Sequence, residues 1–381
     1  MTEDQQPNKK IRVGVIFGGR SAEHEVSLES ARNIMAALDS DRYEALPIGI
    51  SKEGRWLIGA EAMPQLQAAA DSGAISPAFL SAAQPAAVLG PSAGRALVEI
   101  TASGSANIGQ AIDVFFPVLH GPYGEDGTVQ GLLELADVPY VGAGVLGSAL
   151  GMDKAAMKDV FAAQGLPVVP HIVVRRSDWR DDPDLVLEAL AATGLEYPLF
   201  VKPANMGSSV GISKAHQADE LGPSIELAAQ YDRRIIVEQG IDAQEVECAV
   251  LGNDEPEASM VGEVVAGNEF YDYNAKYIDD NSDLIIPARL DEDTAERVQE
   301  LAVQAFQAID GAGMARVDFF VERSSGEVYV NEINTIPGFT RISMYPKLWE
   351  ASGLSYRELV ERLIGLAIER HEDRANNRIA R

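Results

Sequence analysis

Residues 315–334 read "ARVDFFVERSSGEVYVNEIN", two apolar runs separated by the polar tetrapeptide 323–326. Runs rich in Val, Phe, Tyr and Ile around a short Gly-containing turn predict a β-hairpin. If the turn centres near Ser325, Asp318 faces Glu332 across the strands. Because successive side chains alternate faces, Arg316 shares the face of Asp318, and Asn334 shares the face of Glu332.

This predicted hairpin brings two carboxylates and an amide oxygen together beside one guanidinium. Hard oxygen ligands suit Mg²⁺, which takes few protein ligands and completes its shell with water and substrate phosphate. The alternative is a hairpin with one solvated face. Runs as apolar as "VDFFVE" and "VYVNEIN" disfavour that alternative, so we expect Asp318, Glu332 and Asn334 to hold a metal.

The rest of the chain alternates strand and helix through its first two-thirds, which predicts an α/β fold with α+β character in the C-terminal part. Predicted strands are 11–17, 43–50, 111–119, 171–176, 197–203, 210–215, 234–239, 245–252 and 258–267; predicted helices are 27–38, 127–136, 147–165, 184–194, 218–232, 291–310 and two near the C-terminus. Residues 60–110 carry few strong signals. We expect three domains, at 1–143, 144–238 and 239–381.

Composition limits the classes of function. The chain has 381 residues and a net charge of −27, from 31 basic and 58 acidic side chains, which argues against nucleic-acid and anionic-membrane partners. No apolar run approaches a spanning helix, and the N-terminus lacks the apolar core of a signal peptide. The single cysteine, Cys248, lies in a strand-like run and is expected to pack in the core. These features predict a cytoplasmic protein.

Lysines and glycines suggest a phosphate site. Lys202 ends a strand in "FVKPANMGSSVG" (200–211), and the backbone N–H groups of the following Gly-Ser loop could cradle phosphate. A plain Gly-Ser turn is an equally good interpretation of this stretch alone. Lys154 opens a predicted helix, and Glu238 and Glu245 flank a linker; taken singly, all three are surface charges.

Two other glycine motifs raise different questions. The stretch 142–147 matches G-x-G-x-x-G after a strand, but residues 165–176 hold no acid at the offset that a dinucleotide site needs. The turn in "GVIFGGRSAEHEVSLES" (14–30) carries Glu23 and Glu25, which would repel phosphate. A helix N-terminus stabilises a carboxylate, but these residues alone leave the role of the acidic turn open.

In chain order, these pieces resemble the ATP-grasp ligases, and among them the D-alanine:D-alanine ligase family. The matching blocks are "GGRSAEHEVS", "LHGPYGEDGTVQG", "MDK", "VKPANMGSSVG", "EVECAVLG", "YDYNAKY", "RVDFF" and "NEINTIPGFTRIS". The resemblance covers nearly the whole chain. It implies a three-domain ATP-grasp fold with an N-terminal Rossmann-like parallel sheet, and ATP-dependent joining of two D-alanine molecules through an acyl phosphate for peptidoglycan synthesis.

The resemblance also implies a role for each matching residue. The ATP-binding residues would be Lys154, Lys202, Glu238, Glu245, Phe270 and Lys276, and the ligands of two Mg²⁺ or Mn²⁺ ions would be Asp318, Glu332 and Asn334. The first D-alanine would meet Glu23 through its ammonium group and His120 through its carboxylate. Arg316 and the Gly338 N–H would stabilise the tetrahedral oxyanion. Ser208 and Tyr277 would link a closing loop to Glu23, and Ser343 and Met344 would lie near the second substrate.

Family features beyond the site are implied in the same way: a homodimer and a possible K⁺ requirement. Tyr277 favours the dipeptide product over a D-lactate ester. Asn274 and Gly240 depart from the usual residues of the loop and the adenine pocket. The other hypotheses are a depsipeptide ligase, a dinucleotide-dependent oxidoreductase using 142–147, and a non-catalytic ATP-binding protein.

Overall fold

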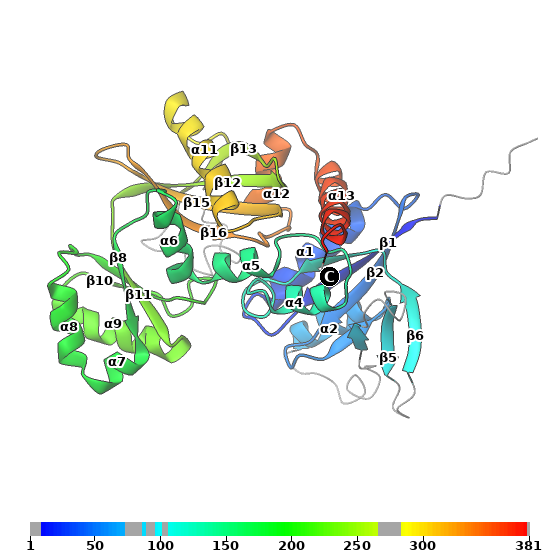
Figure 1. Cartoon of the computed structure of the whole chain (residues 1–381), viewed down its shortest axis with the longest axis horizontal. Coiled ribbons are helices and arrows are strands. Elements are labelled where there is room, and N and C mark those ends of the chain that lie inside the picture. Colours follow the sequence, from blue (N-terminus) through cyan, green and yellow to red (C-terminus); the bar gives the residue numbers. More distant parts are fainter. Residues whose placement is uncertain (1–8, 73–85, 89–95, 101–105, 266–282, 379–381) are drawn as a thin grey trace, which may run out of the picture.

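The computed structural model describes residues 9–72, 86–88, 96–100, 106–265 and 283–378. Three larger sheets organise the molecule, and Figure 1 shows them in three neighbouring parts. This arrangement confirms the predicted α/β class with an antiparallel C-terminal part. In the described part of the chain, no helix is both long and apolar enough to cross a membrane.

The N-terminal part is built on a four-stranded sheet of order β3-β2-β1-β7, in which β1 runs parallel to both of its neighbours. Its elements are β1 (Ile11–Gly18), α1 (His24–Ala37), β2 (Tyr43–Ile50), β3 (Trp56–Ile58), α2 (Ala62–Ser72), β7 (Val114–Val118) and α4 (Thr128–Leu135). Side chains of β1 alternate between two cores. Val15 packs with α1 and Ile16 packs with α4, as expected for a sheet covered by helices on both faces.

Residues 60–110 hold more structure than their composition predicts. Besides α2, they contribute the strands β4 (Ala86–Val88), β5 (Ala96–Ile100) and β6 (Ala106–Ala111), which form a separate antiparallel sheet. Runs rich in Ala, Ser and Gly give weak periodicity, which explains why the sequence did not predict these elements.

The middle part contains an antiparallel sheet of order β10-β9-β11-β8. Its elements are α5 (Val145–Met152), α6 (Lys154–Ala163), β8 (His171–Arg175), α7 (Arg176–Asp181), α8 (Pro183–Ala191), β9 (Leu199–Pro203), β10 (Ser213–Ala215), α9 (Ala218–Tyr231) and β11 (Arg234–Gln239). The single helix predicted over 147–165 is wrong, because the chain breaks it at Asp153. The Asp153 side chain accepts a hydrogen bond from the Ala156 N–H and caps α6, so Lys154 becomes its first residue.

The C-terminal part contains the five-stranded antiparallel sheet β14-β13-β12-β15-β16. Its elements are β12 (Ala243–Gly252), β13 (Glu257–Val265), β14 (Asp283–Ile285), α11 (Glu292–Ala308), β15 (Gly313–Glu322), β16 (Val328–Asn334), α12 (Met344–Ala351) and α13 (Tyr356–Ala375). Cys248 is fully buried in the core of this sheet, as predicted.

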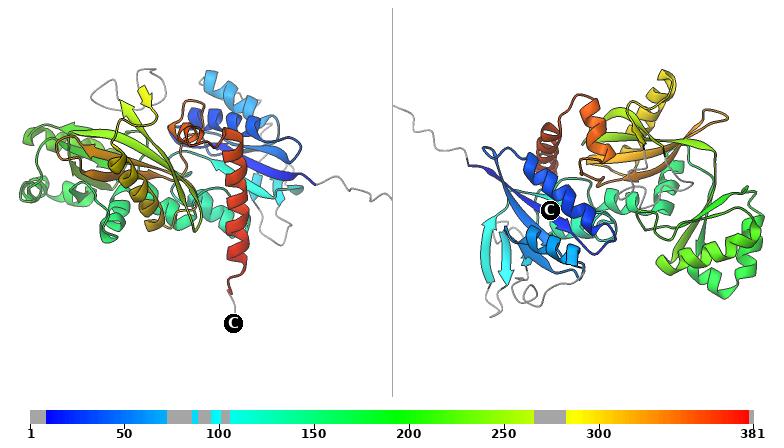
Figure 2. Two further views of the ribbon diagram at one scale, coloured as in Figure 1. Left: turned by 90° about the horizontal axis from the view of Figure 1, so that it is seen from above. Right: turned by 180° about the vertical axis from the view of Figure 1, so that it is seen from behind.

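Two helices join parts of the molecule that are distant in sequence. Met157 and Phe161 of α6 pack in the core of the C-terminal sheet. Leu359 and Leu363 of α13 share the core of the N-terminal sheet, beside α1. Both views in Figure 2 show α13 next to the N-terminal part, and in the left view its C-terminal end extends away from the molecule. The three sheets are therefore held around one central region.

The G-x-G-x-x-G stretch has a packing role in this fold. Helix α5 begins at Val145, inside the motif, and packs against the turn that follows α11. A Cβ on Gly147 would lie 2.8 Å from the backbone oxygen of Asp310. Close helix packing thus accounts for a glycine at this position without a dinucleotide.

We predict opposite effects of Gly→Ala substitution at two helical glycines. Gly147→Ala should lower the free energy of unfolding by about 1–3 kcal/mol, because backbone must move to admit the methyl group. Gly131→Ala, in α4, should raise it by up to about 1 kcal/mol, because a Cβ there meets nothing within 4 Å. Thermal and urea unfolding measure both. Equal stability of the two variants would contradict the packing role of Gly147.

Candidate active site

The β15–β16 hairpin has the register predicted from the sequence. Arg316 lies opposite Asn334 and Asp318 lies opposite Glu332, with a register shift directly after Asp318. Nε and Nη2 of Arg316 each donate to an oxygen of Asp318 at 2.7 Å. Nδ2 of Asn334 donates to Oδ2 of Asp318 at 3.1 Å. The predicted metal ligands and the guanidinium therefore form one cluster.

Lys154 connects this hairpin to the Gly-Ser loop. Its Nζ lies 3.1 Å from Oε2 of Glu332 and donates to the backbone oxygen of Met206 at 3.1 Å. Burial lowers the pKa of Lys154, but the carboxylates around it, Glu332 foremost, outweigh burial and raise that pKa. The ammonium charge is therefore retained inside the site.

The oxygen atoms of the hairpin side chains suit a cation that shares its shell with phosphate. Among the described residues, no three His, Cys, Asp or Glu side chains are grouped so that they could hold a metal by themselves. Asp318 and Glu332 supply two carboxylates, Asn334 adds an amide, and Arg316 and Lys154 neutralise the carboxylates in this structure. Such an incomplete oxygen set suits Mg²⁺ bound together with a nucleotide.

A second charged cluster lies one turn further along α6, at Lys158. Glu238 is almost fully buried, and its two oxygens lie 3.0 Å from Nζ of Lys158 and 2.5 Å from Nζ of Lys202. Burial raises the pKa of Glu238, but the two lysines outweigh it and lower that pKa to about 2. Lys158 was not predicted from the sequence, although it follows Lys154 at the i+4 spacing of one helix face.

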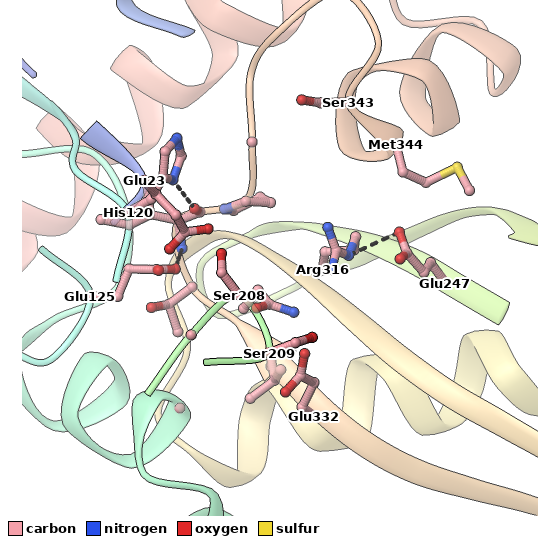
Figure 3. Close-up of a pocket in the computed structure, with 18 of the residues that line it drawn as sticks. Glu23, His120, Glu125, Ser208, Ser209, Glu247, Arg316, Glu332, Ser343 and Met344 are labelled. Carbon is pink, nitrogen blue, oxygen red and sulfur yellow. Dashed lines mark hydrogen bonds and ion pairs between the residues drawn. The ribbon is translucent and has the colours of Figure 1, made fainter. Parts of the chain in front are cut away.

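Glu23 and His120 lie together on the N-terminal side of the site, and Figure 3 shows Glu125 beside them. Glu23 is 8% exposed and occupies the N-cap of α1, close to the helix start predicted from the sequence. A Cβ on Gly121 would lie 3.1 Å from Oε2 of Glu23, and a Cβ on Gly207 would lie 3.2 Å from the same atom. The Glu23 carboxylate is therefore enclosed by loops of both the N-terminal and the middle part.

His120 and Glu125 bind the same short loop from the C-terminal part. Nδ1 of His120 lies 3.0 Å from the backbone oxygen of Ile336, and Oε1 of Glu125 accepts from the Ile336 N–H at 3.1 Å. Oε2 of Glu125 accepts from the Gly121 N–H at 2.7 Å. Burial lowers the pKa of His120, so the imidazole is neutral. Glu125 was not among the site residues predicted from the sequence.

The charge state of Glu125 depends on its neighbours. Burial and the nearby Glu23 raise the pKa of Glu125 to about 8, although its two N–H donors and Arg316 act in the opposite direction. Glu247, which was also not predicted from the sequence, lies 2.9 Å from Nε of Arg316 (Figure 3). The site thus contains more acids than the predicted set.

The clusters line two adjoining cavities of about 310 and 180 Å³, which share Lys154, Ser209, Ile212, Glu247 and Glu332. Every described residue of the predicted site lines at least one of these cavities. The larger cavity is lined by Glu23, His120, Lys154, Ser208, Arg316, Glu332, Asn334, Gly338, Ser343 and Met344. The smaller cavity is lined by Lys154, Lys202, Glu238, Glu245, Asp318 and Glu332. Phe270, Asn274, Lys276 and Tyr277 lie outside the described residues.

Two sheets that enclose lysines and an acidic hairpin, beside an N-terminal parallel sheet, define an ATP-grasp ligase. The families described as D-ala D-ala ligase N-terminus and C-terminus match residues 12–143 and 160–365. The chain therefore belongs to the D-alanine–D-alanine ligase family, and it is a ligase.

Individual relatives agree with this assignment. The chain is 52% identical to the D-alanine–D-alanine ligase of Chloroherpeton thalassium over 98% of this chain and 100% of that protein. It is 50% identical to the D-alanine–D-alanine ligase of Thermoanaerobacter sp. strain X514, over 96% of this chain and 99% of that protein. The solved D-alanine-D-alanine ligase from Coxiella burnetii matches with a TM-score of 0.81 and 37% identity over 96% of each chain. The solved VanG D-Ala:D-Ser ligase from Enterococcus faecalis also matches with a TM-score of 0.81 and 37% identity, over 94% of this chain and 100% of that chain.

Removal of Lys158 should destabilise the fold far more than removal of an exposed lysine, because it leaves the buried Glu238 with only one cation. Lys158→Met removes one of the two cations at Glu238 and should cost about 3 kcal/mol of unfolding free energy. Lys52→Met, which removes an exposed partner of Glu25, should cost about 1 kcal/mol or less. Thermal unfolding of both variants at one salt concentration measures the difference. Similar losses would contradict the inferred importance of Lys158.

Glu125 should make stability depend on pH. An acid whose pKa is raised on folding binds its proton more tightly in the folded state. The chain should therefore lose stability as pH rises from about 5 toward 8, with no further loss from this group above that pH. Glu125→Gln has no such titration, so its stability relative to the unsubstituted protein should improve over this window. Parallel pH curves for the two proteins would refute the raised pKa.

Proposed function

We propose that this chain joins two D-alanine molecules into D-alanyl-D-alanine while ATP is cleaved to ADP and phosphate. The product serves peptidoglycan synthesis, and the reaction passes through a D-alanyl phosphate. The observation that carries the proposal is the continuity of the two cavities. Lys154 and Glu332 line both, so a nucleotide at the lysines would place its terminal phosphate beside the cavity that contains Glu23 and Arg316.

Lys154 and Lys202 are proposed to bind the phosphates, and Glu238 and Glu245 the adenosine. Asp318, Glu332 and Asn334 would hold two Mg²⁺ or Mn²⁺ ions, which supply positive charge where the phosphates accumulate negative charge. Arg316 and Lys154 now neutralise the same carboxylates, so they are placed to take up new anionic partners. Phe270 and Lys276 complete the proposed nucleotide site, with K⁺ as a further possible cation.

Glu23 is proposed to bind the ammonium group of the first D-alanine, and His120 lies near the carboxylate of the same molecule. That carboxylate attacks the terminal phosphorus of ATP, and the amine of the second D-alanine then attacks the acyl phosphate carbon. Arg316 and the Gly338 N–H stabilise the oxyanion of the tetrahedral intermediate, from which phosphate leaves. Ser343 and Met344 contact the second D-alanine. Ser208 and Tyr277 link the closing loop to Glu23.

We further propose the division into domains 1–143, 144–238 and 239–381, each of which contains one of the larger sheets. A cytoplasmic homodimer is proposed from the family. The identity of the second substrate needs a direct test, because the solved D-Ala:D-Ser ligase is as similar to this chain as the solved D-alanine ligase.

The reaction is tested by phosphate release from ATP and Mg²⁺ with and without D-alanine, with the product identified by mass. We expect release that depends on D-alanine and yields the dipeptide. In competition, added D-serine or D-lactate should give less mixed product than dipeptide at neutral pH. ATP hydrolysis that ignores D-alanine, or a predominant mixed product, would contradict the proposal.

Glu332→Gln should lower turnover by about tenfold or more and raise the Mg²⁺ concentration needed for half-maximal rate, because it removes an anionic ligand. Glu327→Gln is the matched control, since Glu327 is an exposed acid just after the turn of the same hairpin. It should retain the original rate. An unchanged rate and Mg²⁺ dependence in Glu332→Gln would exclude the proposed role.

A further inference from the structure

The loop that carries Gly338 is attached to the N-terminal part on both sides of that glycine. On one side, the N–H of Ile336 donates to Glu125 at 3.1 Å, and its carbonyl oxygen lies 3.0 Å from Nδ1 of His120. On the other side, the N–H of Phe339 donates to Oγ of Ser30 at 3.2 Å. Gly338 therefore lies between two fixed points.

The bonds on the two sides form one directed chain. The carbonyl of Ile336 can only accept, so Nδ1 of His120 carries the proton and Nε2 is the acceptor. Nε2 lies 3.4 Å from Oγ of Ser30, which donates to it while accepting from Phe339. Ser30 is fully buried, and the low pKa of His120 keeps the imidazole in the neutral form that this chain requires.

Aromatic packing fixes the same loop. The Phe339 ring is fully buried, with centroids 6.1 Å from Phe116 of β7, 5.4 Å from Tyr345 and 6.1 Å from Tyr356. The hydroxyl of Tyr356 donates to the Phe339 carbonyl at 2.8 Å. With Ile336 and Phe339 held, Gly338 has little freedom to shift.

The N–H of Gly338 has no acceptor among the residues that the structure describes, and Gly338 lines the larger cavity. Ser30 lies on α1, the helix whose N-cap is Glu23. One rigid helix thus relates the acid proposed for the first substrate to the loop that carries the proposed oxyanion donor.

We infer that Glu125 and Ser30 are positioning residues of the ligation step: they hold Ile336 and Phe339, and so fix the Gly338 N–H where the oxyanion forms. This inference rests on the proposed function. Neither residue needs to touch a substrate. Removal of one oxyanion donor costs a factor of about 10²–10³ in kcat, and a displacement of about 1 Å can cost about 10².

The test uses Ser30→Ala and Glu125→Gln, which release the loop at different points. Ser30→Ala leaves the Phe339 N–H without its acceptor. Glu125→Gln keeps the size of the side chain but replaces one acceptor oxygen with an amide nitrogen, which cannot accept. The N–H of either Ile336 or Gly121 therefore loses its acceptor. We expect kcat to fall about 10- to 100-fold in each, with KM for ATP and for the first D-alanine within about twofold. Glu125→Asp retains two acceptor oxygens and should recover part of kcat.

Ser259→Ala is the matched control. Ser259 is buried, and its Oγ accepts from the Ala249 N–H at 3.0 Å within the C-terminal sheet, away from both cavities. It should lower the melting temperature about as much as Ser30→Ala while leaving kcat unchanged.

A second measurement separates ligation from acyl phosphate formation. Positional isotope exchange in ¹⁸O-labelled ATP, with D-alanine present, reports reversible phosphoryl transfer to the first substrate. We expect this exchange to persist at the original rate in Ser30→Ala and Glu125→Gln while dipeptide formation slows. Exchange that falls in parallel with dipeptide formation would overturn the inference, as would an unchanged kcat in both variants. If the unsubstituted protein shows no D-alanine-dependent turnover, the proposed function fails, and the inference fails with it.

Discussion

The ion pair between Lys154 and Glu332 is the interaction on which the rest of the site depends. Lys154 is the first residue of α6, Glu332 lies on β16, and the same ammonium group binds the Met206 carbonyl of the Gly-Ser loop. One side chain therefore connects the middle and C-terminal sheets at the place where the two cavities meet. Because the pair is largely excluded from water, its geometry matters more than that of an exposed pair.

Buried charge explains much of the remaining arrangement. Glu238 has two lysines, Asp318 has Arg316 and Asn334, and Glu247 lies against the same guanidinium. A set of acids and cations this close is stable only while each charge keeps a partner. A nucleotide with its metal ions brings both signs of charge, so it can exchange partners with the site without leaving a charge uncompensated.

The hairpin register could be predicted from the sequence, because apolar alternation and a Gly-containing turn are local signals that agree. The break at Asp153 also had a local signal, an N-cap residue inside a helical pattern, but the apolar periodicity concealed it. Ser30 and Glu125 could not be predicted. Their partners lie 309 and 211 residues away, and no local pattern reports such contacts. The resemblance to the ligase family gave roles to Lys154, Glu238 and Glu245, which are ordinary surface charges when taken singly, and it gave Glu23 its expected ligand.

We propose that one continuous site holds the nucleotide, its metal ions and the first D-alanine. A crystal structure with a non-hydrolysable ATP analogue, Mg²⁺ and D-alanine tests it most directly. We predict metal density on Asp318, Glu332 and Asn334, phosphates at Lys154 and Lys202, and the amino-acid ammonium group at Glu23. Metal bound elsewhere, or D-alanine absent from the cavity that contains Glu23 and Arg316, would show that the three ligands do not share one site.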